Sequence, residues 1–367
     1  MTLFSRKNWG ILFLFAMMLL VSACGSGNSS SSSSNSPGQS QQGGEGTGEA
    51  QTQEQEELIK VSIAQPQDIL SFAPLYVARA KGFFEEEGID LTVQVLSGGS
   101  QSIQALSGDS VQFSDSSSTD FLSTVSKGLD FVALQATIMQ TMDVAVSKEW
   151  AEQKGVDRSS PIEDRIRALE GAVIGSTGPG AVSETYPKWL VKKVGLDPEK
   201  ALEVIAIGGL PARQAALQSG QIQAYVSSPP GPEQAEVDGF GYVLIPPSDV
   251  PGFENFVHEV LFAKREYVEA NPEVVKKVVR AISRGNNYLL DNPEESKKLI
   301  QQFFPEVDER VLSSSIDNII GQVPRNGRMS QEHWDFVLQF LKEIGSDVGS
   351  LDTAEGGFWT NQYNDLQ

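Results

Sequence analysis

The chain has 367 residues, which is enough to bury a large core, and two lobes are expected rather than one. Hydrophobic residues make up 40% and charged residues 21% of the chain, as is ordinary for a globular protein. A phosphate-binding surface needs clustered Lys and Arg, and with a formal net charge of −20 no nucleic acid is expected as a partner.

Residues 1–23 have the pattern of an export signal. Arg6 and Lys7 give a basic start, and residues 9–23 form an apolar run. This run is shorter than the ~20 apolar residues of a membrane span, as in the hydrophobic region of a signal peptide. It leads into the motif VSAC, which resembles a bacterial lipobox and implies cleavage before Cys24 and acylation of its thiol. The alternative is an uncleaved signal anchor with an incidental cysteine.

Cys24 is the only cysteine of the chain, and it stands where a lipid would be attached. The segment that follows, up to Glu57, contains no aromatic residue and no Leu, Ile or Val. Such a segment cannot bury enough apolar surface to offset the entropy lost on ordering. We therefore expect residues 24–57 to be a flexible tether, which holds the rest of the chain to the extracytoplasmic face of the cell membrane through the lipid.

After the tether, strand-like and helix-like segments alternate. Residues 58–65 resemble a buried strand, 72–88 a helix and 89–99 a second strand, followed by a short helix (100–107), a strand (110–115) and a polar turn. The same rhythm returns in residues 171–180, 184–195, 201–209 and 221–230. This alternation predicts an α/β fold with two lobes, in which two mostly parallel sheets with flanking helices are joined by hinge strands.

Two long apolar segments with strand character are predicted to connect the lobes. Residues 131–148 would carry the chain from lobe one to lobe two, and residues 242–264 would carry it back. Lobe one is accordingly expected over residues 58–140 and 259–367, and lobe two over residues 141–258.

The C-terminal part of the chain is predicted to be largely helical. Pro272 and Pro293 stand where the first turn of a helix accepts proline. A further amphipathic helix is expected between Ser330, as its N-cap, and Gly345, as its stop. His333 is expected on the solvent-exposed face of that helix.

A strand–glycine–helix–strand pattern occurs twice, over residues 96–117 and 207–228. In each copy a Gly-Gly pair ends a strand and opens a helix, and a Ser-Ser pair follows the next strand. Ligands of open α/β sheets bind outside the carboxyl ends of the strands, where bare glycines and helix N-termini offer free N–H groups. The repeat predicts that each lobe carries half of a polar cup and that the halves face each other across a cleft. The alternative is that these are turn residues only and the repeat is a coincidence.

Three segments carry a resemblance to a known family: residues 72–93 (FAPLYVARAKGFFEEEGIDLTV), 169–184 (LEGAVIGSTGPGAVSE) and 208–230 (GGLPARQAALQSGQIQAYVSSPP). Their order and spacing resemble ABC-transporter solute-binding proteins of the nitrate, sulfonate, taurine and thiamine-pyrimidine-precursor group. The resemblance covers roughly residues 58–290. Gln223 stands where the family often has Asp, which weakens any assignment of a particular ligand.

The resemblance implies a type II periplasmic-binding-protein fold, a monomer, and a small organic solute that is delivered to a membrane permease powered by a separate ATPase. Carried over residue by residue, the implied ligand contacts are Gln65, Ser71, Phe72, Ala73 and Pro74 after the first strand, Gly98, Gly99 and Ser100 after the second, Ser116, Ser117 and Ser118 after the third, Met139 and Thr141 near the crossing, and Ser176, Thr177, Gly178, Gly180, Gly209, Ser227 and Ser228 in lobe two. Core packing explains Phe72 equally well.

Sequence features of enzymes are sparse. Two isolated histidines, and no cysteine after residue 24, cannot form a zinc site of the usual kind, so neither metal nor cofactor is expected, and His258 is assigned a structural role. Neither a G-x-S-x-G motif nor a phosphate-binding P-loop motif occurs. Synthases of the resembling family use a cysteine-rich motif and an active-site histidine, and this chain has neither. Two alternatives stay open: a protein like those synthases, or an exported enzyme that uses Asp115, Asp120 and Glu184.

The class of solute is also open at this point, with a sulfonate, a nitrate-like anion, an aromatic acid and a pyrimidine as candidates. An anion usually invites an arginine in the cleft, and Arg213 is the arginine that lies within the repeated pattern. The alternative is that Arg213 faces solvent. Helix N-termini and hydroxyl groups would suit either an anion or a neutral heteroaromatic ring.

Overall fold

The computed structural model describes residues 57–366. The predicted export signal, Cys24 and the tether up to residue 56 lie outside the described residues. Within residues 57–366, no helix is both long enough and apolar enough to cross a membrane.

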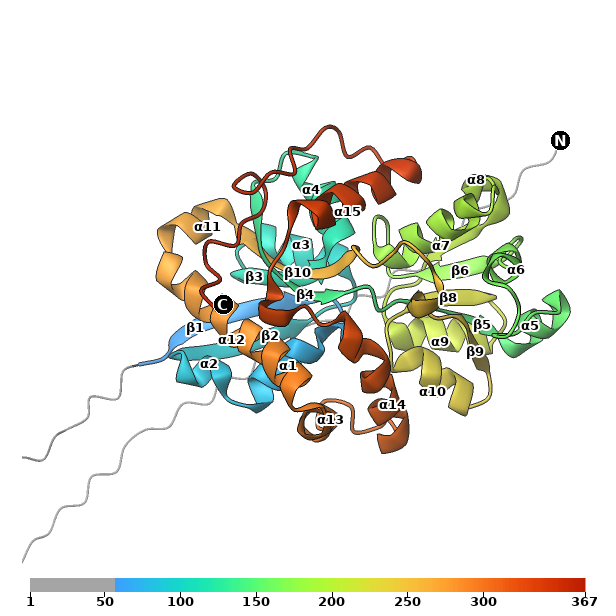
Figure 1. Ribbon diagram of the computed structural model, residues 1–367, viewed down its shortest axis with the longest axis horizontal. Coiled ribbons are helices and arrows are strands. Elements are labelled where there is room, and N and C mark those ends of the chain that lie inside the picture. The colour runs from blue at the N-terminus through green and yellow to red at the C-terminus, as the bar shows by residue number, and fades with distance from the viewer. Residues whose placement is uncertain (1–56, 367) are drawn as a thin grey trace, which may run out of the picture. The chain divides into compact units, whose positions relative to one another are not determined.

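The described chain is built on two five-stranded sheets, which Figure 1 shows side by side. The first sheet has the order β2 (Ile89–Val95), β1 (Ile59–Gln65), β3 (Phe113–Ser117), β10 (Val257–Lys264) and β4 (Phe131–Met139). The second has the order β7 (Glu203–Ala206), β6 (Val173–Ser176), β8 (Ala224–Ser227), β5 (Asp143–Ser147) and β9 (Gly241–Ile245). Helices flank both sheets, so the predicted two-lobed α/β fold is confirmed. We call the first sheet with its helices lobe one and the second sheet with its helices lobe two.

Each sheet contains one antiparallel strand, and in both cases it is the strand that the chain enters from the other lobe. β10 is antiparallel to β3 and β4, and β5 is antiparallel to β8 and β9, whereas the other paired strands run parallel. The chain passes from β4 directly to β5 and returns from β9 to β10, so both crossings fall in the segments predicted to hold them. Of the predicted lobe boundaries, residues 140 and 141 lie between β4 and β5, while 258 and 259 lie inside β10. These boundaries stay a prediction.

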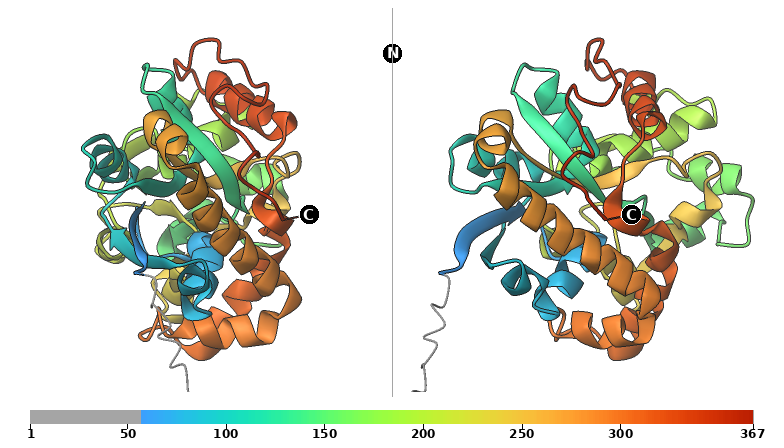
Figure 2. Two further views of the ribbon diagram at one scale, coloured as in Figure 1. Left: turned by 90° about the vertical axis from the view of Figure 1, so that its left-hand side faces the viewer. Right: turned by 60° about the vertical axis from the view of Figure 1, so that its left-hand side comes forward.

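The helices of lobe one follow the strands in chain order and then fill the C-terminal third. They are η1 (Leu70–Phe72), α1 (Ala73–Ala80), α2 (Phe83–Glu86), α3 (Gly99–Ser107), α4 (Ser118–Val125), α11 (Arg265–Ala270), α12 (Pro272–Asp291), α13 (Pro293–Gln301), α14 (Glu309–Ile319), η3 (Ile320–Gln322), η4 (Arg325–Gly327) and α15 (Gln331–Glu343). The long helix α12, orange in Figure 2, packs along α1. Gly285 permits this approach, since a Cβ there would lie 2.2 Å from the carbonyl oxygen of Pro74.

Lobe two has shorter helices. They are α5 (Lys148–Lys154), α6 (Ile162–Arg167), α7 (Val182–Lys193), α8 (Pro198–Ala201), α9 (Leu210–Gln218), α10 (Gly231–Val237) and η2 (Pro247–Asp249). α7 packs against β6 and β8, and α10 packs against β9 and β5. The helices that follow β6 and β8 thus cover the sheet of lobe two, α7 at β6 and β8 and α10 at β9 and β5.

Several predicted helix limits need correction. The helix expected over residues 72–88 is split into α1 and α2, because Gly82 adopts a φ of +72° that ends the first helix. The polar turn expected after residue 115 is helix α4, which begins because the side chain of Ser117 caps it. Ser330 caps α15 as predicted, but His333 is half-buried and accepts the backbone N–H of Ser330.

Two C-terminal helices contact both lobes. α15 packs on α4 of lobe one and α7 of lobe two, where Trp189, Phe253 and Phe340 form part of an aromatic cluster with ring centroids 4.8–5.8 Å apart. α14 packs on η1 of lobe one and α10 of lobe two. The lobes are therefore joined by these helices as well as by the two crossings.

Candidate functional site

The two copies of the repeated pattern occupy equivalent places in the two sheets. The first copy follows β2 and forms α3 and β3, and the second copy follows β7 and forms α9 and β8. In each sheet these strands flank a central parallel strand, β1 in lobe one and β6 in lobe two. The glycine pairs therefore stand at the carboxyl ends of parallel strands, where open α/β sheets bind ligands.

The two copies meet across the gap between the lobes. Gly98 has a φ of +147°, and a Cβ built there would lie 3.3 Å from the carbonyl oxygen of Thr177 in lobe two. From the other side, a Cβ on Gly208 would lie 3.8 Å from the carbonyl oxygen of Ser97. The two halves of the predicted cup thus face each other, and the lobes are closed on one another.

Asp120 lies where α3 and α4 of lobe one approach lobe two. Its carboxylate accepts the hydroxyl of Ser117 at 2.8 Å, and burial raises the pKa of Asp120 to about 6. Only glycine fits at position 99, because a Cβ on Gly99 would lie 1.9 Å from Oδ2 of Asp120. On the side of lobe two, a Cβ on Gly180 would lie 3.6 Å from Oδ1, at an ordinary contact distance. In lobe two the N–H of Gly180 donates to Glu184 at 2.7 Å. The two candidate carboxylates thus hold the facing loops in shape.

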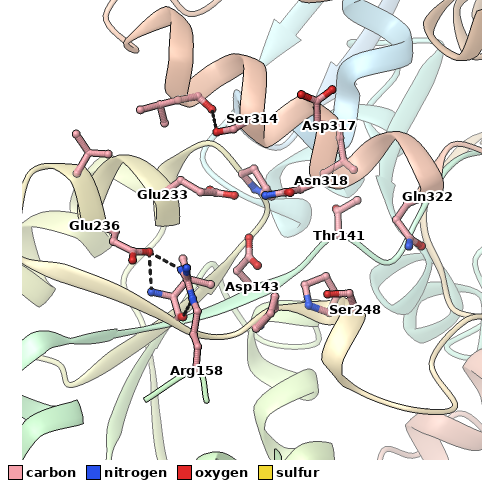
Figure 3. A pocket seen from close by; sticks show the side chains of 17 residues that line it. Thr141, Asp143, Arg158, Glu233, Glu236, Ser248, Ser314, Asp317, Asn318 and Gln322 are labelled. Carbon is pink, nitrogen blue, oxygen red and sulfur yellow. Dashed lines mark hydrogen bonds and ion pairs between the residues drawn. The ribbon is translucent and has the colours of Figure 1, made fainter. Parts of the chain in front are cut away.

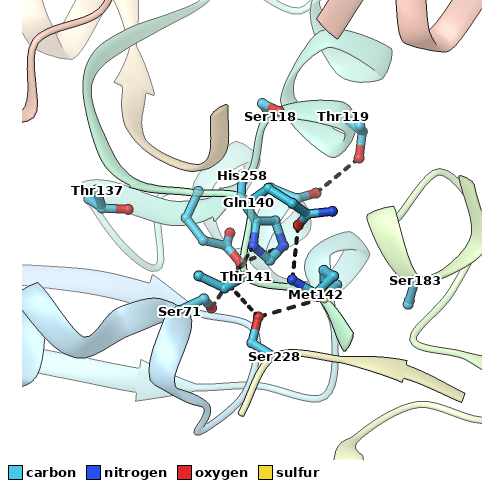
Figure 4. Close-up of polar contacts among 12 residues, drawn as sticks. Ser71, Ser118, Thr119, Thr137, Gln140, Thr141, Met142, Ser183, Ser228 and His258 are labelled. Carbon is cyan, nitrogen blue, oxygen red and sulfur yellow. Dashed lines mark hydrogen bonds and ion pairs between the residues drawn. The ribbon is translucent and has the colours of Figure 1, made fainter. Parts of the chain in front are cut away.

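A hydroxyl cluster fills the hinge, as Figure 4 shows. Oγ1 of Thr141 lies 2.7 Å from Oγ of Ser228 and 3.2 Å from Nδ1 of His258. Ser228 also donates to the sulfur of Met142 at 3.6 Å. All these side chains are buried, so the cluster joins the first crossing to the end of β8 and the start of β10.

Beneath the hinge, three buried ionisable groups lie on lobe one. Nε2 of His258 lies 3.4 Å from Oε1 of Glu259, which accepts the hydroxyl of Ser71 at 3.1 Å. Burial lowers the pKa of His258 to about 3 and raises the pKa of Glu259, so burial disfavours an ion pair at this contact. Asp115 accepts the hydroxyl of Thr137 at 2.9 Å, and burial raises its pKa to about 7. His258 thus has the structural role expected for it.

The structure brings part of the predicted contact set together at the closed gap. The residues there are Ser71, Gly98, Gly99, Ser117, Thr141, Thr177, Gly180 and Ser228. Five other predicted contact residues have their partners within their own lobe. Gln65 donates to Tyr76, Ser116 pairs with Ser114, Ser118 donates to Val257, Ser176 donates to Ile205, and Gly209 is the N-cap of α9. Phe72, Ala73 and Pro74 are buried in lobe one, Phe72 and Ala73 within a hydrophobic cluster, so packing explains Phe72. Ser100 is exposed, Met139 and Gly178 are half-buried, and Ser227 is buried with its hydroxyl unpaired within residues 57–366.

Arg213 does not face solvent. Its side chain is buried, its Nη1 donates to the carbonyl of Val226, and its Nη2 donates to Oε1 of Gln67 in lobe one at 2.8 Å. A second bond between the lobes runs from the N–H of Leu70 to the carbonyl of Pro229 at 2.7 Å. Sequence reasoning missed these interlobe bonds, because the partners lie about 150 residues apart and neither shows a motif.

A cavity of about 740 Å³ lies on the other side of Thr141, between lobe two and α14 (Figure 3). Thr141 is the one predicted contact that lines it. Its walls include two acidic side chains that sequence reasoning missed, Asp143 at the start of β5 and Glu233 on α10. Within the described range, no group of three His, Cys, Asp or Glu residues is placed to hold a metal ion.

Comparison with known proteins assigns the family. The sequence profile described as NMT1/THI5 like matches residues 70–296. The chain belongs to this family. The resemblance found in the sequence is therefore confirmed. This NMT1/THI5-like chain is similar to the formylaminopyrimidine-binding protein of Halalkalibacterium halodurans, with 26% identity over 73% of this chain and 79% of the relative. It is also similar to the 4-amino-5-hydroxymethyl-2-methylpyrimidine phosphate synthase of Aspergillus parasiticus, with 21% identity over 79% of this chain and 83% of the relative.

Solved structures share the fold of this NMT1/THI5-like chain. A protein of Bordetella bronchiseptica RB50 superposes with a TM-score of 0.71 and 25% identity, over 84% of this chain and 96% of its own. The alkanesulfonate-binding protein SsuA of Xanthomonas axonopodis pv. citri, solved bound to MOPS, superposes with a TM-score of 0.63 and 16% identity, over 78% of this chain and 92% of its own. The second likeness concerns the fold alone.

Proposed function

We propose that this protein is an extracytoplasmic solute-binding protein of an ABC importer. It holds a small organic solute between its lobes and delivers it to a permease that a separate ATPase powers. The observation that carries the proposal is the meeting of the two equivalent glycine loops, with Gly98 against Thr177 and Gly208 against Ser97. Two lobes that close on each other through bare backbone can also separate and close over a ligand.

The proposed contacts of the solute are the groups that the closed gap brings together. Thr141, Ser228 and Ser71 offer hydroxyl groups at the hinge, and Gly98 and Gly180 leave the backbone accessible on either side. In the closed form these groups bond to one another or touch across the gap. Opening of lobe two, proposed as residues 141–258, away from residues 58–140 and 259–367 would separate Gly98 from Thr177 and Gly180 from Asp120 and admit a ligand between them. The bonds of Thr141 to Ser228 and of Ser71 to Glu259 each lie within one of these two parts, so the ligand would compete for these hydroxyls.

Attachment to the membrane is part of this proposal. The lipobox-like motif and the polar tether support a lipid on Cys24, with the globular part outside the cytoplasm. Mass spectrometry of the chain recovered from the membrane of an exporting host tests it. We expect a mature chain that starts at Cys24 and carries the mass of added acyl groups, and we expect Cys24→Ser to release the protein into the soluble fraction. A chain with a free Cys24 thiol contradicts the attachment.

The alternative function is catalysis, as in the relative named a pyrimidine phosphate synthase. Against an enzyme that uses Asp115, Asp120 and Glu184, each of the three carboxylates has a partner in the fold. Asp115 accepts from Thr137, Asp120 accepts from Ser117, and Glu184 accepts the N–H of Gly180. The deciding experiment is mass spectrometry of the solute that co-purifies with the full chain. A binding protein returns the solute unchanged, at about one per chain, after incubation with a metabolite mixture. A chemically altered product, formed in amounts that exceed the protein, would establish the enzyme.

A further inference from the structure

The cavity beside the hinge has walls from both lobes and from the crossings. Lobe two contributes β5, α10 and β9, and lobe one contributes α14 and η3. Much of the surface is apolar, from Val243, Val311, Ile319 and the prolines that follow β8 and β9. Its volume of about 740 Å³ is in the range of small-molecule sites in proteins.

The charges on the walls are strongly unbalanced. Arg158 is the one basic residue of the lining, and its guanidinium is already engaged by Glu236 and by the carbonyl of Val243. Asp317 is likewise engaged, with Nζ of Lys297 2.7 Å away. The acidic groups that remain are Asp143 and Glu233. The charge of Arg158 offsets part of the rise that burial causes in the pKa of both, but its guanidinium donates to Glu236 and Val243 and not to either of them.

Asp143 and Glu233 point into this cavity from lobe two, as Figure 3 shows. Asp143 is only 4% exposed, and its Oδ2 has no hydrogen-bond partner anywhere in residues 57–366. Oε2 of Glu233 is also without a partner in that range. Burial raises the pKa of Glu233 to about 7, and burial and then the neighbouring Glu233 raise the pKa of Asp143. A fold that leaves one oxygen of each carboxyl group without a partner loses stability, and a ligand that supplies the missing donors would recover it.

We propose that this cavity binds an organic cation, whose protonated amine or amidinium group lies between Asp143 and Glu233 and whose apolar part contacts Val311 and Ile319. The proposal rests on the function proposed above, because it names the class of solute that the lobes capture and places its charged group in this cavity. Thr141, which lines the cavity, connects this position to the hinge hydroxyls proposed as further contacts. Anions are excluded from this position, since they would meet carboxylates and no free basic group. A metal ion is disfavoured as well, because the described residues offer it no third ionisable ligand.

Such a ligand would contact both lobes at once. The polar side chains of Ser314, Asn318 and Gln322 line the opposite wall, on α14 and η3 of lobe one. The amide of Asn318 lies beside the carboxylate of Glu233 in Figure 3, and its hydrogen bond offsets part of the rise that burial causes in the pKa of Glu233. A cation held by Asp143 and Glu233 on lobe two would therefore reach donors and acceptors on lobe one, and its binding would favour the closed arrangement of the lobes.

The test uses the exported full chain and probes matched in shape but opposite in charge. Benzylamine and benzamidine are the cations, and benzoate and benzenesulfonate are the anions, with binding measured by titration calorimetry and melting temperature. We expect the cations to bind and to raise the melting temperature. Asp143→Asn and Glu233→Gln should each weaken cation binding at least tenfold. Asp317→Asn removes the same charge from the same cavity, but its carboxylate is already paired, and it should change binding less than twofold.

A second measurement guards against a folding defect. Because Asp143→Asn removes a buried charge without a partner, the ligand-free variant should melt at a temperature equal to or above that of the wild type. The inference is overturned if neither cation binds, or if Asp143→Asn binds cations as tightly as the wild type. If the anions bind and the cations do not, the receptor function stands and the cation site is wrong. If no probe binds and no solute co-purifies, the proposed function fails as well.

Discussion

The polar groups on the two sides of the hinge differ in their hydrogen-bond partners. On the side of the glycine loops, Thr141, Ser228 and His258 bond to one another, and Asp120 accepts the hydroxyl of Ser117. On the side of the cavity, Asp143 and Glu233 have oxygens without partners in the described part of the chain. Ser227, Asp115 and Glu259 on the first side also keep a buried oxygen without a partner in residues 57–366, but only Asp143 and Glu233 line the cavity, where a ligand can supply donors.

This difference separates two requirements of a binding protein. Bonds between the lobes, such as that from Arg213 to Gln67, stabilise closure without a ligand, and a solute that displaces the bonded hydroxyls of the hinge must replace every bond it breaks. Groups left unsatisfied make closure costly until a ligand arrives, so they supply the dependence of closure on the ligand. The contacts of the glycine loops therefore determine how the lobes pack against each other, and the cavity determines which solute stabilises the closed arrangement.

The largest effect we predict is a loss of stability with rising pH, caused by buried carboxyl groups on both sides. The pKa of Asp115 is raised from 3.8 to about 7, so the unfolded chain loses this proton first as the pH rises from about 4 to about 7. The stabilisation is complete below pH 4 and is lost above pH 7, at a cost on the order of 4 kcal/mol for Asp115. Urea unfolding at pH 5 and pH 8 measures this effect. We expect the free energy of unfolding to fall more between these pH values for the wild type than for Asp115→Asn.

The wild type must be compared with variants because the titration of His258 changes the free energy of unfolding with pH in the opposite direction. Its lowered pKa means that falling pH destabilises the fold between about 6.5 and about 3. Glu233→Gln serves as the counterpart of Asp115→Asn on the cavity side. With benzamidine bound, the pH dependence due to Glu233 should shrink while that due to Asp115 persists. If the stabilities of Glu233→Gln and Asp115→Asn depend on pH in the same way with benzamidine present, the two sides of the hinge do not differ as described.

Much of the fold could be predicted from local sequence. Alternating apolar strands and helices gave the two lobes, and the long apolar segments 131–148 and 242–264 contain both crossings. The errors arise where a single side chain overrides the pattern. Gly82 ends α1 within a continuous amphipathic run, and Ser117 starts a helix in a stretch whose composition is typical of a turn.

The site was predictable only in part. Paired glycines such as Gly98 and Gly99 are visible locally, because a backbone that must be approached closely requires glycine wherever it occurs. No local sequence pattern identifies Asp143 and Glu233, since they lie 90 residues apart and come together only because α10 packs on β5. Unsatisfied partners of this kind are a property of the packed tertiary structure, not of any local pattern.

A second prediction tests the tight packing of the glycine-loop side. Gly99→Ala would place a methyl group 1.9 Å from Oδ2 of Asp120, a side chain held in place by Ser117. We expect the free energy of unfolding to fall by about 2 kcal/mol, as for overpacked cores. Gly321→Ala is the control, because nothing lies within 4 Å of its added Cβ. If the two variants are equally stable, the loops are not packed as described.

A third prediction concerns closure without a ligand. Gln67→Ala removes the acceptor that joins lobe one to Nη2 of Arg213. A hydrogen bond to a charged group contributes about 1.5 kcal/mol, so the open form should gain roughly tenfold in population. Small-angle scattering should report a larger radius of gyration for this variant. Gln94→Ala, which removes an exposed bond within lobe one, should leave the scattering unchanged.

The smallest effect is expected at Thr141, which both sides share. Thr141→Val keeps the shape of the side chain but removes the hydroxyl that bonds to Ser228 and His258, and Thr141→Ser keeps the hydroxyl and removes a methyl group. We expect Thr141→Val to lower the free energy of unfolding by about 1 kcal/mol more than a Thr141→Ser change does.

Combining Thr141→Val with Ser228→Ala isolates the bond itself. Because both single variants break the same contact, the double variant should lose less stability than the sum of the two, by about 0.5 kcal/mol or more. Strict additivity would mean that the hinge hydroxyls do not depend on each other, and the contrast between a satisfied and an unsatisfied side of the hinge would lose its basis.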